Sequence, residues 1–136
     1  LPASTLRYYD KQGLLPSLRR DGNNIRIFTE QDCMDIKIIE CLKKSGLSIK
    51  DIKKFIDMLG QGEKTLNERL KIFLDRREAL KQELQNLQEI LNIINYKCWY
   101  YEQACSFGTE TFMKNIKVPE EFREARESLQ AKIKFH

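Results

Sequence analysis

The sequence predicts a mostly α-helical protein, in which a small head with a two-stranded hairpin is joined to one long helix and a short helical tail. Three observations predict this fold class. Apolar residues recur in alternating steps of three and four between residues 65 and 102, a stretch without Pro or Gly. Two shorter stretches before it begin with helix-capping residues and end at Gly. A turn sequence near the N-terminus separates two short alternating segments.

The first element is expected to be a short helix over residues 2–12. Pro2 suits a first helical turn, and Gly13 suits the position after the last one. Leu6 and Tyr9 lie three residues apart and are expected to face inward. The residues left for the outer face, which carry the donors that contact phosphates and base edges, are Thr5, Arg7, Tyr8 and Lys11.

The hairpin that follows is predicted from the turn residues 21–24, Asp-Gly-Asn-Asn, because Gly and Asn tolerate positive φ. Its strands, within Leu18–Arg20 and Ile25–Phe28, form what we call the wing (residues 18–28). Residues 1–28 hold five basic and two acidic residues, a balance of +3, whereas the long helix is neutral. A basic head favours an anionic partner such as nucleic acid. The wing arginines are Arg19, Arg20 and Arg26.

Two capped helices are expected next. Thr29 and Asp32 resemble a capping box for a helix to about Ser45, and Ser48 begins another that closes at Gly60. The basic corner between them makes Lys43 a plausible second phosphate contact. The residues expected to face inward are Met34, Ile36, Ile38, Ile39, Cys41 and Leu42 in the first helix, and Ile49, Ile52, Ile56 and Leu59 in the second.

The long helix carries a heptad seam that Arg77 alone interrupts with a charge. A helix of roughly 55 Å would protrude from a compact bundle about 30 Å across, so we expect a second copy of the chain to cover the seam. The alternative is that the helix folds back onto its own tail. The predicted dimerisation residues, called the seam below, are Leu66, Leu70, Phe73, Leu80, Leu84, Leu87, Leu91 and Ile94.

The tail begins where Gly108 is expected to break the long helix, and Pro119 opens a last amphipathic helix from Glu120 to about Phe135. The predicted divisions are a head at residues 1–60, a hinge and coiled coil at 61–102, and a tail at 103–136.

Composition argues against several functions. There is no apolar run long enough for a membrane span, and no signal peptide is visible. The four Cys match no zinc-finger or disulfide framework, so we expect reduced thiols in the cytoplasm and neither a metal nor another cofactor. We also expect no enzymatic activity, because clustered carboxylates, an internal His and a Gly-rich phosphate loop are all missing.

Two motifs resemble the MerR family of bacterial transcription regulators: Ser-Thr-Leu-Arg-Tyr-Tyr-Asp-Lys-x-Gly-Leu-Leu-Pro at 4–16, and Gly-Leu-Ser-Ile-x-Asp-Ile at 46–52. The resemblance spans residues 1 to about 102. It implies a winged helix-turn-helix head and an antiparallel dimer coiled coil. The family's first helix has no counterpart here, so we expect further N-terminal residues. Asn24-Ile25-Arg26 stands where the family usually has Gly-aromatic-Arg.

The resemblance implies a homodimer on promoter DNA with an overlong spacer. Inducer binding makes the protein distort that DNA, and RNA polymerase responds indirectly. By position, Arg7 and Tyr8 would contact the major groove, Arg26 would be the wing arginine, and Lys43 a second-wing base. The competing function is a coiled-coil adaptor that binds protein without specific DNA binding.

Three kinds of inducer stay open. An organic ligand would suit the aromatic cluster that includes Tyr96, Trp99, Tyr100 and Tyr101, unless these rings only pack the helix end. A soft metal would use Cys98 and Cys105. An electrophile would modify Cys41, since residues 41–52 resemble the family's aldehyde-responsive subgroup, although an inward-facing Cys would be inert.

Overall fold

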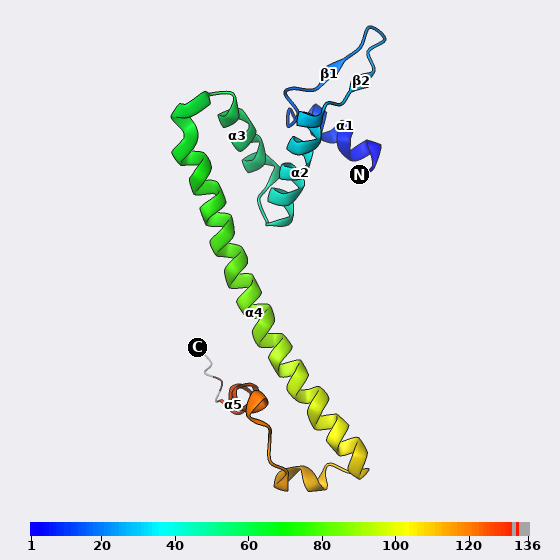
Figure 1. Cartoon of the computed structure of the whole chain (residues 1–136), viewed down its shortest axis with the longest axis vertical. Helices are drawn as coiled ribbons and strands as arrows, with labels where there is room; N and C mark the ends of the chain where they lie inside the picture. The colour runs from blue at the N-terminus through cyan, green and yellow to red at the C-terminus, as the bar shows by residue number, and fades with distance from the viewer. Residues whose placement is uncertain (132, 134–136) are drawn as a thin grey trace. The chain divides into compact units, whose positions relative to one another are not determined.

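The computed structural model describes residues 1–131 and 133, and it confirms a mostly helical fold with one small hairpin (Figure 1). The chain divides into two compact units, Leu1–Leu80 and the residues from Lys81 onward. The elements are α1 (Ala3–Lys11), β1 (Arg19–Arg20), β2 (Arg26–Ile27), α2 (Glu30–Lys44), α3 (Ile49–Leu59), α4 (Leu66–Phe107) and α5 (Arg123–Gln130), with short 3₁₀ turns at Gly62–Thr65, Thr111–Asn115 and Glu120–Phe122.

Helix α1 lies within one residue of its predicted bounds. Pro2 occupies the N-cap position, and Gly13 follows the helix with a φ of +76°. This left-handed conformation costs a residue with a Cβ more than it costs Gly. It lets the Leu14 N–H donate to the Tyr9 carbonyl at 2.9 Å. The chain thereby turns sharply after α1 and brings Leu14 and Leu15 into the core.

The wing forms as predicted. Strands β1 and β2 pair antiparallel, with Arg19 opposite Ile27 and Arg20 opposite Arg26. Asp21 Oδ1 accepts hydrogen bonds from the backbone N–H groups of Asn23 and Ile25, both at 2.9 Å. Asn24 adopts a φ of 63°, which Asn tolerates better than most residues.

The capping box of α2 is confirmed, and it is tied to the segment after α1. Thr29 Oγ1 accepts the Asp32 N–H at 3.2 Å, and Asp32 Oδ2 accepts the Thr29 N–H at 2.8 Å. Ser17 Oγ donates to the other Asp32 oxygen at 2.7 Å. Burial by itself raises the pKa of Asp32, but the hydrogen bonds from Ser17 and Thr29 outweigh it and lower that pKa below 3.8.

The core of the first unit joins α1, α2, α3 and the start of α4. Ile72 of α4 packs against it, and the Phe73 ring meets Phe55 edge-on with centroids 5.4 Å apart. This packing fixes the first turns of α4 to the helices before it. The buried core residues are Tyr9, Leu14, Leu15, Ile39, Leu42, Ile52, Phe55 and Ile56.

The predicted inward face of α2 is wrong in part. Met34 is 60% exposed, Ile38 is 41% exposed, and Cys41 is exposed, whereas Ile39 and Leu42 are buried. Apolar residues occupy two neighbouring stripes of this helix, and their spacing alone does not say which stripe meets the core.

In α3 the predicted inward face is correct except at two positions. Leu59 is 43% exposed, and Phe55, which the prediction omits, is buried.

The residue before α4, Thr65, is buried, and its hydroxyl donates to the Met58 carbonyl at 2.9 Å. The helix continues to Phe107, five residues beyond the predicted coiled coil, and ends as expected at Gly108, which has a φ of +73°. Every seam residue is exposed, by between 38% and 66% of its surface. The tail does fold back along α4, but within the described residues it leaves every seam side chain exposed.

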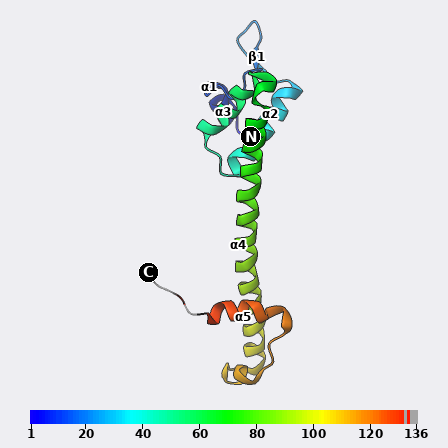
Figure 2. The ribbon, with the colours of Figure 1, turned by 90° about the vertical axis from the view of Figure 1, so that its left-hand side faces the viewer.

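In the second unit α5 lies beside residues 86–93 of α4, as both views of the ribbon show (Figures 1 and 2). Ala125 of α5 and Tyr96 of α4 are buried. Helix α5 ends at Gln130, well short of the predicted Phe135, and Ala131 is extended. Residues 132, 134 and 135 of the predicted helix lie outside the described residues. Across the described ranges, none of the helices combines the length and apolarity needed to cross a membrane.

Asp32→Asn is expected to lower the free energy of unfolding by about 2 kcal/mol at pH 7, because an amide nitrogen cannot accept the bonds that one carboxylate oxygen accepts. The folded-state pKa lies below 3.8, so this contribution is present above pH 3.8 and is lost as the pH falls through the folded-state value.

Urea unfolding at pH 7 and near pH 3 measures both effects. Glu30→Gln, in the first turn of the same helix and exposed, serves as the matched control. An equal loss of stability in the two variants, or a loss from Asp32→Asn that does not change with pH, would contradict this role.

Candidate nucleic-acid interface

Helix α1 presents a basic outer face. Arg7, Tyr8 and Lys11 are exposed, and Thr5 is half-buried. Arg7 and Lys11 lie four residues apart, so their side chains project from neighbouring positions on the same face. The guanidinium, ammonium and phenol groups supply several hydrogen-bond donors on a helix with few large apolar side chains at its surface. This face can therefore contact the phosphates and base edges of a nucleic-acid groove.

Tyr9 anchors α1 from its other side. Its side chain is fully buried, and its hydroxyl donates to Glu40 of α2. The Nζ atom of Lys43 lies 5.8 Å from the centre of the Tyr9 ring. Burial, together with the hydrogen bond to Glu40, raises the pKa of Tyr9 to about 12, so the phenol stays protonated at neutral pH. The orientation of the outer face of α1 is thus set by a buried polar contact.

Arg7 of α1 and Arg26 of the wing line one hollow of about 400 Å³. The side chains that share this hollow come from the two segments that sequence reasoning singled out separately. The structure brings them together on one surface of the first unit. The lining residues are Ala3, Leu6, Arg7, Asn24, Ile25, Arg26 and Phe28.

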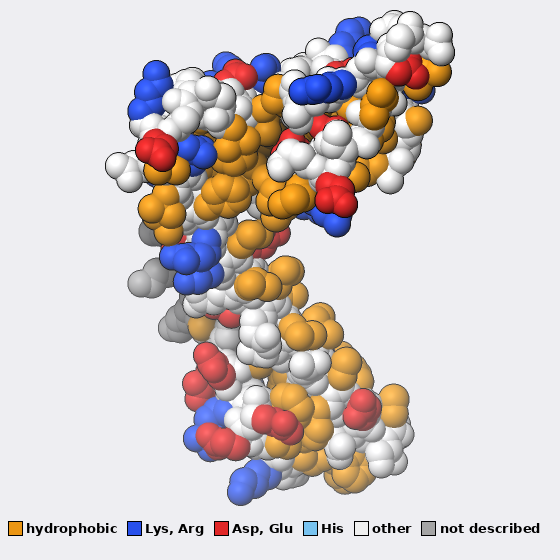
Figure 3. All heavy atoms as spheres, turned by 45° about the horizontal axis from the view of Figure 1, so that its top comes forward, with side chains coloured by type: hydrophobic (Ala, Val, Ile, Leu, Met, Phe, Trp, Pro, Cys, Tyr) orange, Lys and Arg blue, Asp and Glu red, His pale blue; other side chains and the backbone are white. Residues whose placement is uncertain are grey.

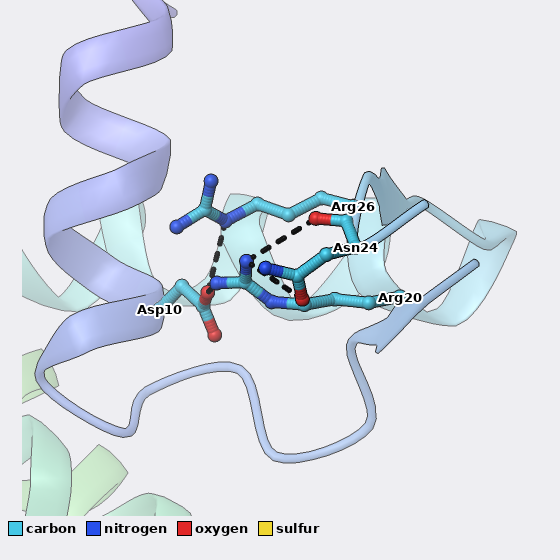
Figure 4. Close-up of polar contacts among 4 residues, drawn as sticks. All are labelled: Asp10, Arg20, Asn24 and Arg26. Atoms are coloured by element: carbon cyan, nitrogen blue, oxygen red, sulfur yellow. Dashed lines mark hydrogen bonds and ion pairs between the residues drawn. The ribbon is translucent and has the colours of Figure 1, made fainter. Parts of the chain in front are cut away.

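Asp10 joins α1 to the wing (Figure 4). One of its carboxylate oxygens accepts from Arg26 Nε at 2.9 Å and from Arg20 Nη2 at 3.2 Å. Arg20 Nη1 also reaches the Asn24 carbonyl oxygen at 3.4 Å. Sequence reasoning counted Asp10 only as a negative charge in the head and missed this bridge. The Tyr-Tyr-Asp-Lys sequence around Asp10 does not predict this contact, because Arg20 and Arg26 lie ten or more residues away along the chain.

The other predicted contacts lie at the edges of this surface. Arg19 precedes Arg20 in β1, so its side chain points to the opposite face of the hairpin. Lys43 is exposed in the last turn of α2. Figure 3 shows Lys and Arg side chains spread over the surface of the first unit. The structure thus joins Arg7, Arg20 and Arg26 through the hollow and Asp10, and it leaves Arg19 apart from them.

The aromatic cluster at the end of α4 packs mainly against the tail of the same unit. The Trp99 and Phe122 rings lie 5.6 Å apart, and Tyr96 stacks on Trp99 at 6.1 Å. A hollow of about 410 Å³ remains beside these rings, lined also by Glu110, Lys114 and Arg126. The hydrogen bond from Tyr100 to Glu110, at 3.0 Å, raises the pKa of Tyr100. Tyr101 is exposed. The partner of these rings is therefore Phe122, which sequence reasoning placed in the tail helix without linking it to them.

The four cysteines are all free and exposed. Cys98 and Cys105 both lie on α4, seven residues apart, so about 10 Å of helix axis separates them. One zinc ion holds its thiolates at about 2.3 Å each, so these two side chains of one chain cannot share it. Among residues 1–131 and 133, no group of three or more His, Cys, Asp or Glu side chains is placed to hold a metal ion.

The short exposed helix, the basic wing and the long helix after them define a winged helix-turn-helix protein. A family model described as "MerR HTH family regulatory protein" matches residues 1–59. An uncharacterized HTH-type transcriptional regulator of Haemophilus influenzae is 36% identical over 120 residues, which cover 88% of this chain and 89% of that protein. The chain therefore belongs to the MerR family of transcriptional regulators.

Other relatives agree with this assignment. The HTH-type transcriptional regulator AdhR of Bacillus subtilis is 36% identical over 80 residues, 59% of this chain and 57% of that protein. The crystal structure of HiNmlR, a MerR family regulator lacking the sensor domain, bound to promoter DNA, matches with a TM-score of 0.78 and 35% identity. The match covers 88% of this chain and 90% of that one. These comparisons confirm the predicted family and the predicted fold class.

Proposed function

We propose that this regulator binds double-stranded promoter DNA through α1 and the wing. The observation that carries the proposal is the hollow that Arg7 and Arg26 line together, because a helix with exposed hydrogen-bond donors and an arginine of the wing then share one surface. The similarity to HiNmlR, whose structure contains promoter DNA, supports it. The DNA-contacting residues proposed are Thr5, Arg7, Tyr8, Lys11, Arg19, Arg20, Arg26 and Lys43.

We further propose that the protein acts as a homodimer. The exposed seam forms a regular apolar stripe along α4, and hydrophobic side chains are visible at the surface of both compact units (Figure 3). An apolar stripe of this length is unfavourable in water and is characteristic of a coiled-coil contact. The neutral charge balance of the long helix does not oppose pairing with an identical copy, and the family resemblance implies that the two copies run antiparallel.

The proposed mechanism is distortion of a promoter whose spacer is too long, in response to an inducer, with RNA polymerase responding to the altered DNA. This activity needs neither catalysis nor a bound cofactor, and it takes place in the cytoplasm. We also propose that residues 60 and 102 are the functional boundaries between the head, the coiled coil and the tail. A coiled-coil adaptor would instead bind its partner with little dependence on salt, whereas neutralisation of phosphates makes DNA affinity fall steeply with salt.

Cys41 is a candidate for sensing the inducer because its side chain is exposed, whereas a buried thiol would be inert. Cys41 also lines a hollow of about 660 Å³, together with Lys37 and Lys44, so a small molecule can approach its thiol. The aromatic cluster is less favoured, because its rings already pack against Phe122. We therefore propose a thiol-reactive electrophile as the inducer and Cys41 as the residue it modifies.

Arg7→Ala is expected to weaken binding at least tenfold to a duplex that the wild-type protein selects from a random pool, because a charged contact to DNA is lost. Gel-shift titration measures this, with sedimentation to show that the dimer persists. Lys54→Ala, an exposed base on α3, is the matched control. Unchanged affinity of Arg7→Ala would disprove the proposed docking of α1.

Leu84→Lys is expected to convert dimers into monomers, because it places a charge at one of the most exposed positions of the seam. Sedimentation velocity measures the change. Gln85→Lys introduces the same residue one position outside the seam and should leave the dimer intact. A dimer that persists in Leu84→Lys at micromolar concentration would count against the coiled coil.

Treatment with an α,β-unsaturated aldehyde is expected to add the mass of one aldehyde at Cys41, because the thiol adds across the carbon–carbon double bond without a leaving group and Cys41 is the exposed thiol that lines the hollow with Lys37 and Lys44. Intact mass spectrometry of the wild type, Cys41→Ser and Cys98→Ser locates the adduct: Cys41→Ser should lose it, and Cys98→Ser should retain it. If Cys41 stays unmodified under conditions that change promoter binding, the thiol mechanism is wrong and the aromatic hollow becomes the better candidate.

A further inference from the structure

The wing contains a pair of like charges that is unfavourable by itself. Arg20 and Arg26 lie directly opposite one another in the β1–β2 ladder, so their side chains share one face of the hairpin. Like charges at directly opposite positions destabilise a strand pair. A hairpin with only two residues in each strand is marginal even without such repulsion. Something outside the hairpin must therefore compensate for it.

Asp10 supplies the compensation from α1. A single carboxylate oxygen, Oδ2, accepts from both arginines, and the Asp10 side chain is only 22% exposed. The Arg26 side chain is 26% exposed, so this second ion pair is partly shielded from water. Asp10 follows Arg7, Tyr8 and Tyr9 directly along α1. The residue that neutralises the wing is thus part of the helix that faces the major groove in the proposed function.

We propose that Asp10 is a positioning residue for DNA recognition, which fixes the wing arginines relative to the reading face of α1. The inference depends on the proposed function, because it concerns the same DNA-binding surface. A carboxylate in such a surface repels phosphates, and on charge alone its removal would strengthen binding to any DNA. Asp10 therefore favours binding of the correct DNA sequence only under one condition. The free energy gained by fixing the wing arginines must exceed the free energy lost to repulsion of the phosphates.

The two arginines contact Asp10 through different guanidinium nitrogens, which gives them different roles. Arg26 contacts Asp10 through Nε, and Figure 4 shows its two terminal nitrogens pointing away from the carboxylate. Those nitrogens form the fork that fits a phosphate. Arg20 uses Nη2 for Asp10 and Nη1 for Asn24, so its fork is engaged within the protein. Arg26 therefore has its terminal nitrogens free for a direct phosphate contact, whereas Arg20 contributes to the proposed DNA-binding surface chiefly by holding the wing in place.

The experiment compares a specific and a non-specific duplex. The first is selected by the wild-type protein from a random pool, and the second has the same composition in shuffled order. Fluorescence anisotropy gives both affinities for the full chain. Asp10→Asn is expected to bind the shuffled duplex more tightly and the selected duplex more weakly, so that the specificity ratio falls about tenfold or more. Asp10→Glu, which retains the carboxylate, should recover most of the ratio.

Glu78→Gln removes one negative charge from an exposed position of α4 and is the matched control. It should leave the specificity ratio unchanged. If Asp10→Asn strengthened binding to both duplexes by the same factor, Asp10 would be only a repulsive charge and the positioning role would be disproved. If the wild type did not distinguish the duplexes at all, the proposed function itself would fail, which is a separate outcome.

A second variant covers the case in which Asp10→Asn weakens the fold. Arg20→Gln keeps Asp10 paired with Arg26 but removes the residue that holds the wing. It should lower the specificity ratio in the wild-type background, because the wing then loses one of its two contacts with Asp10. An unchanged specificity ratio in Arg20→Gln would overturn the inference.

Discussion

The proposed DNA-binding surface depends on one contact beneath it, the packing of the buried Tyr9 ring under α1 and its hydrogen bond to Glu40. A helix of nine residues has little stability of its own, so tertiary packing must hold α1 in place. Tyr9 provides a large apolar ring for that packing. Its hydroxyl would be costly to bury without a partner, and Glu40 of α2 provides the acceptor. The exposed donors on the other side of α1 take their orientation from this contact.

The protein has two chemically different exposed surfaces, one charged and one apolar. The first unit buries an apolar core and exposes cationic side chains on α1 and the wing, whereas α4 leaves an apolar seam exposed. Ions at a surface remain hydrated and available for phosphates, but exposed leucines gain free energy only when another apolar surface covers them. DNA binding and self-association therefore use different physical forces, and salt should weaken the first much more than the second.

Elements with local signals were predicted well from the sequence. The capping box at Thr29, the turn before Asn24 and the breaks at Gly13 and Gly108 depend on residues within a few positions of one another. Features that depend on packing were not. Which stripe of α2 is buried is decided by the helices around it, so Met34, Ile38 and Cys41 were assigned inward although they are exposed. Asp10 bridges Arg20 and Arg26, which lie ten and sixteen positions away, and no periodic pattern predicts such a contact.

The start of α4 has a consequence for dissecting the molecule. Arg76 donates to the Ser45 carbonyl at 3.3 Å, and Ile72 and Phe73 pack on the core and on Phe55. A fragment cut at residue 60 would lose these contacts and expose apolar surface that is buried in the intact chain. The smallest autonomously folding piece should therefore extend to about residue 80, where the first compact unit ends. Any rotation imposed on those first turns of α4 would then be passed to the wing and α1 as a rigid-body movement.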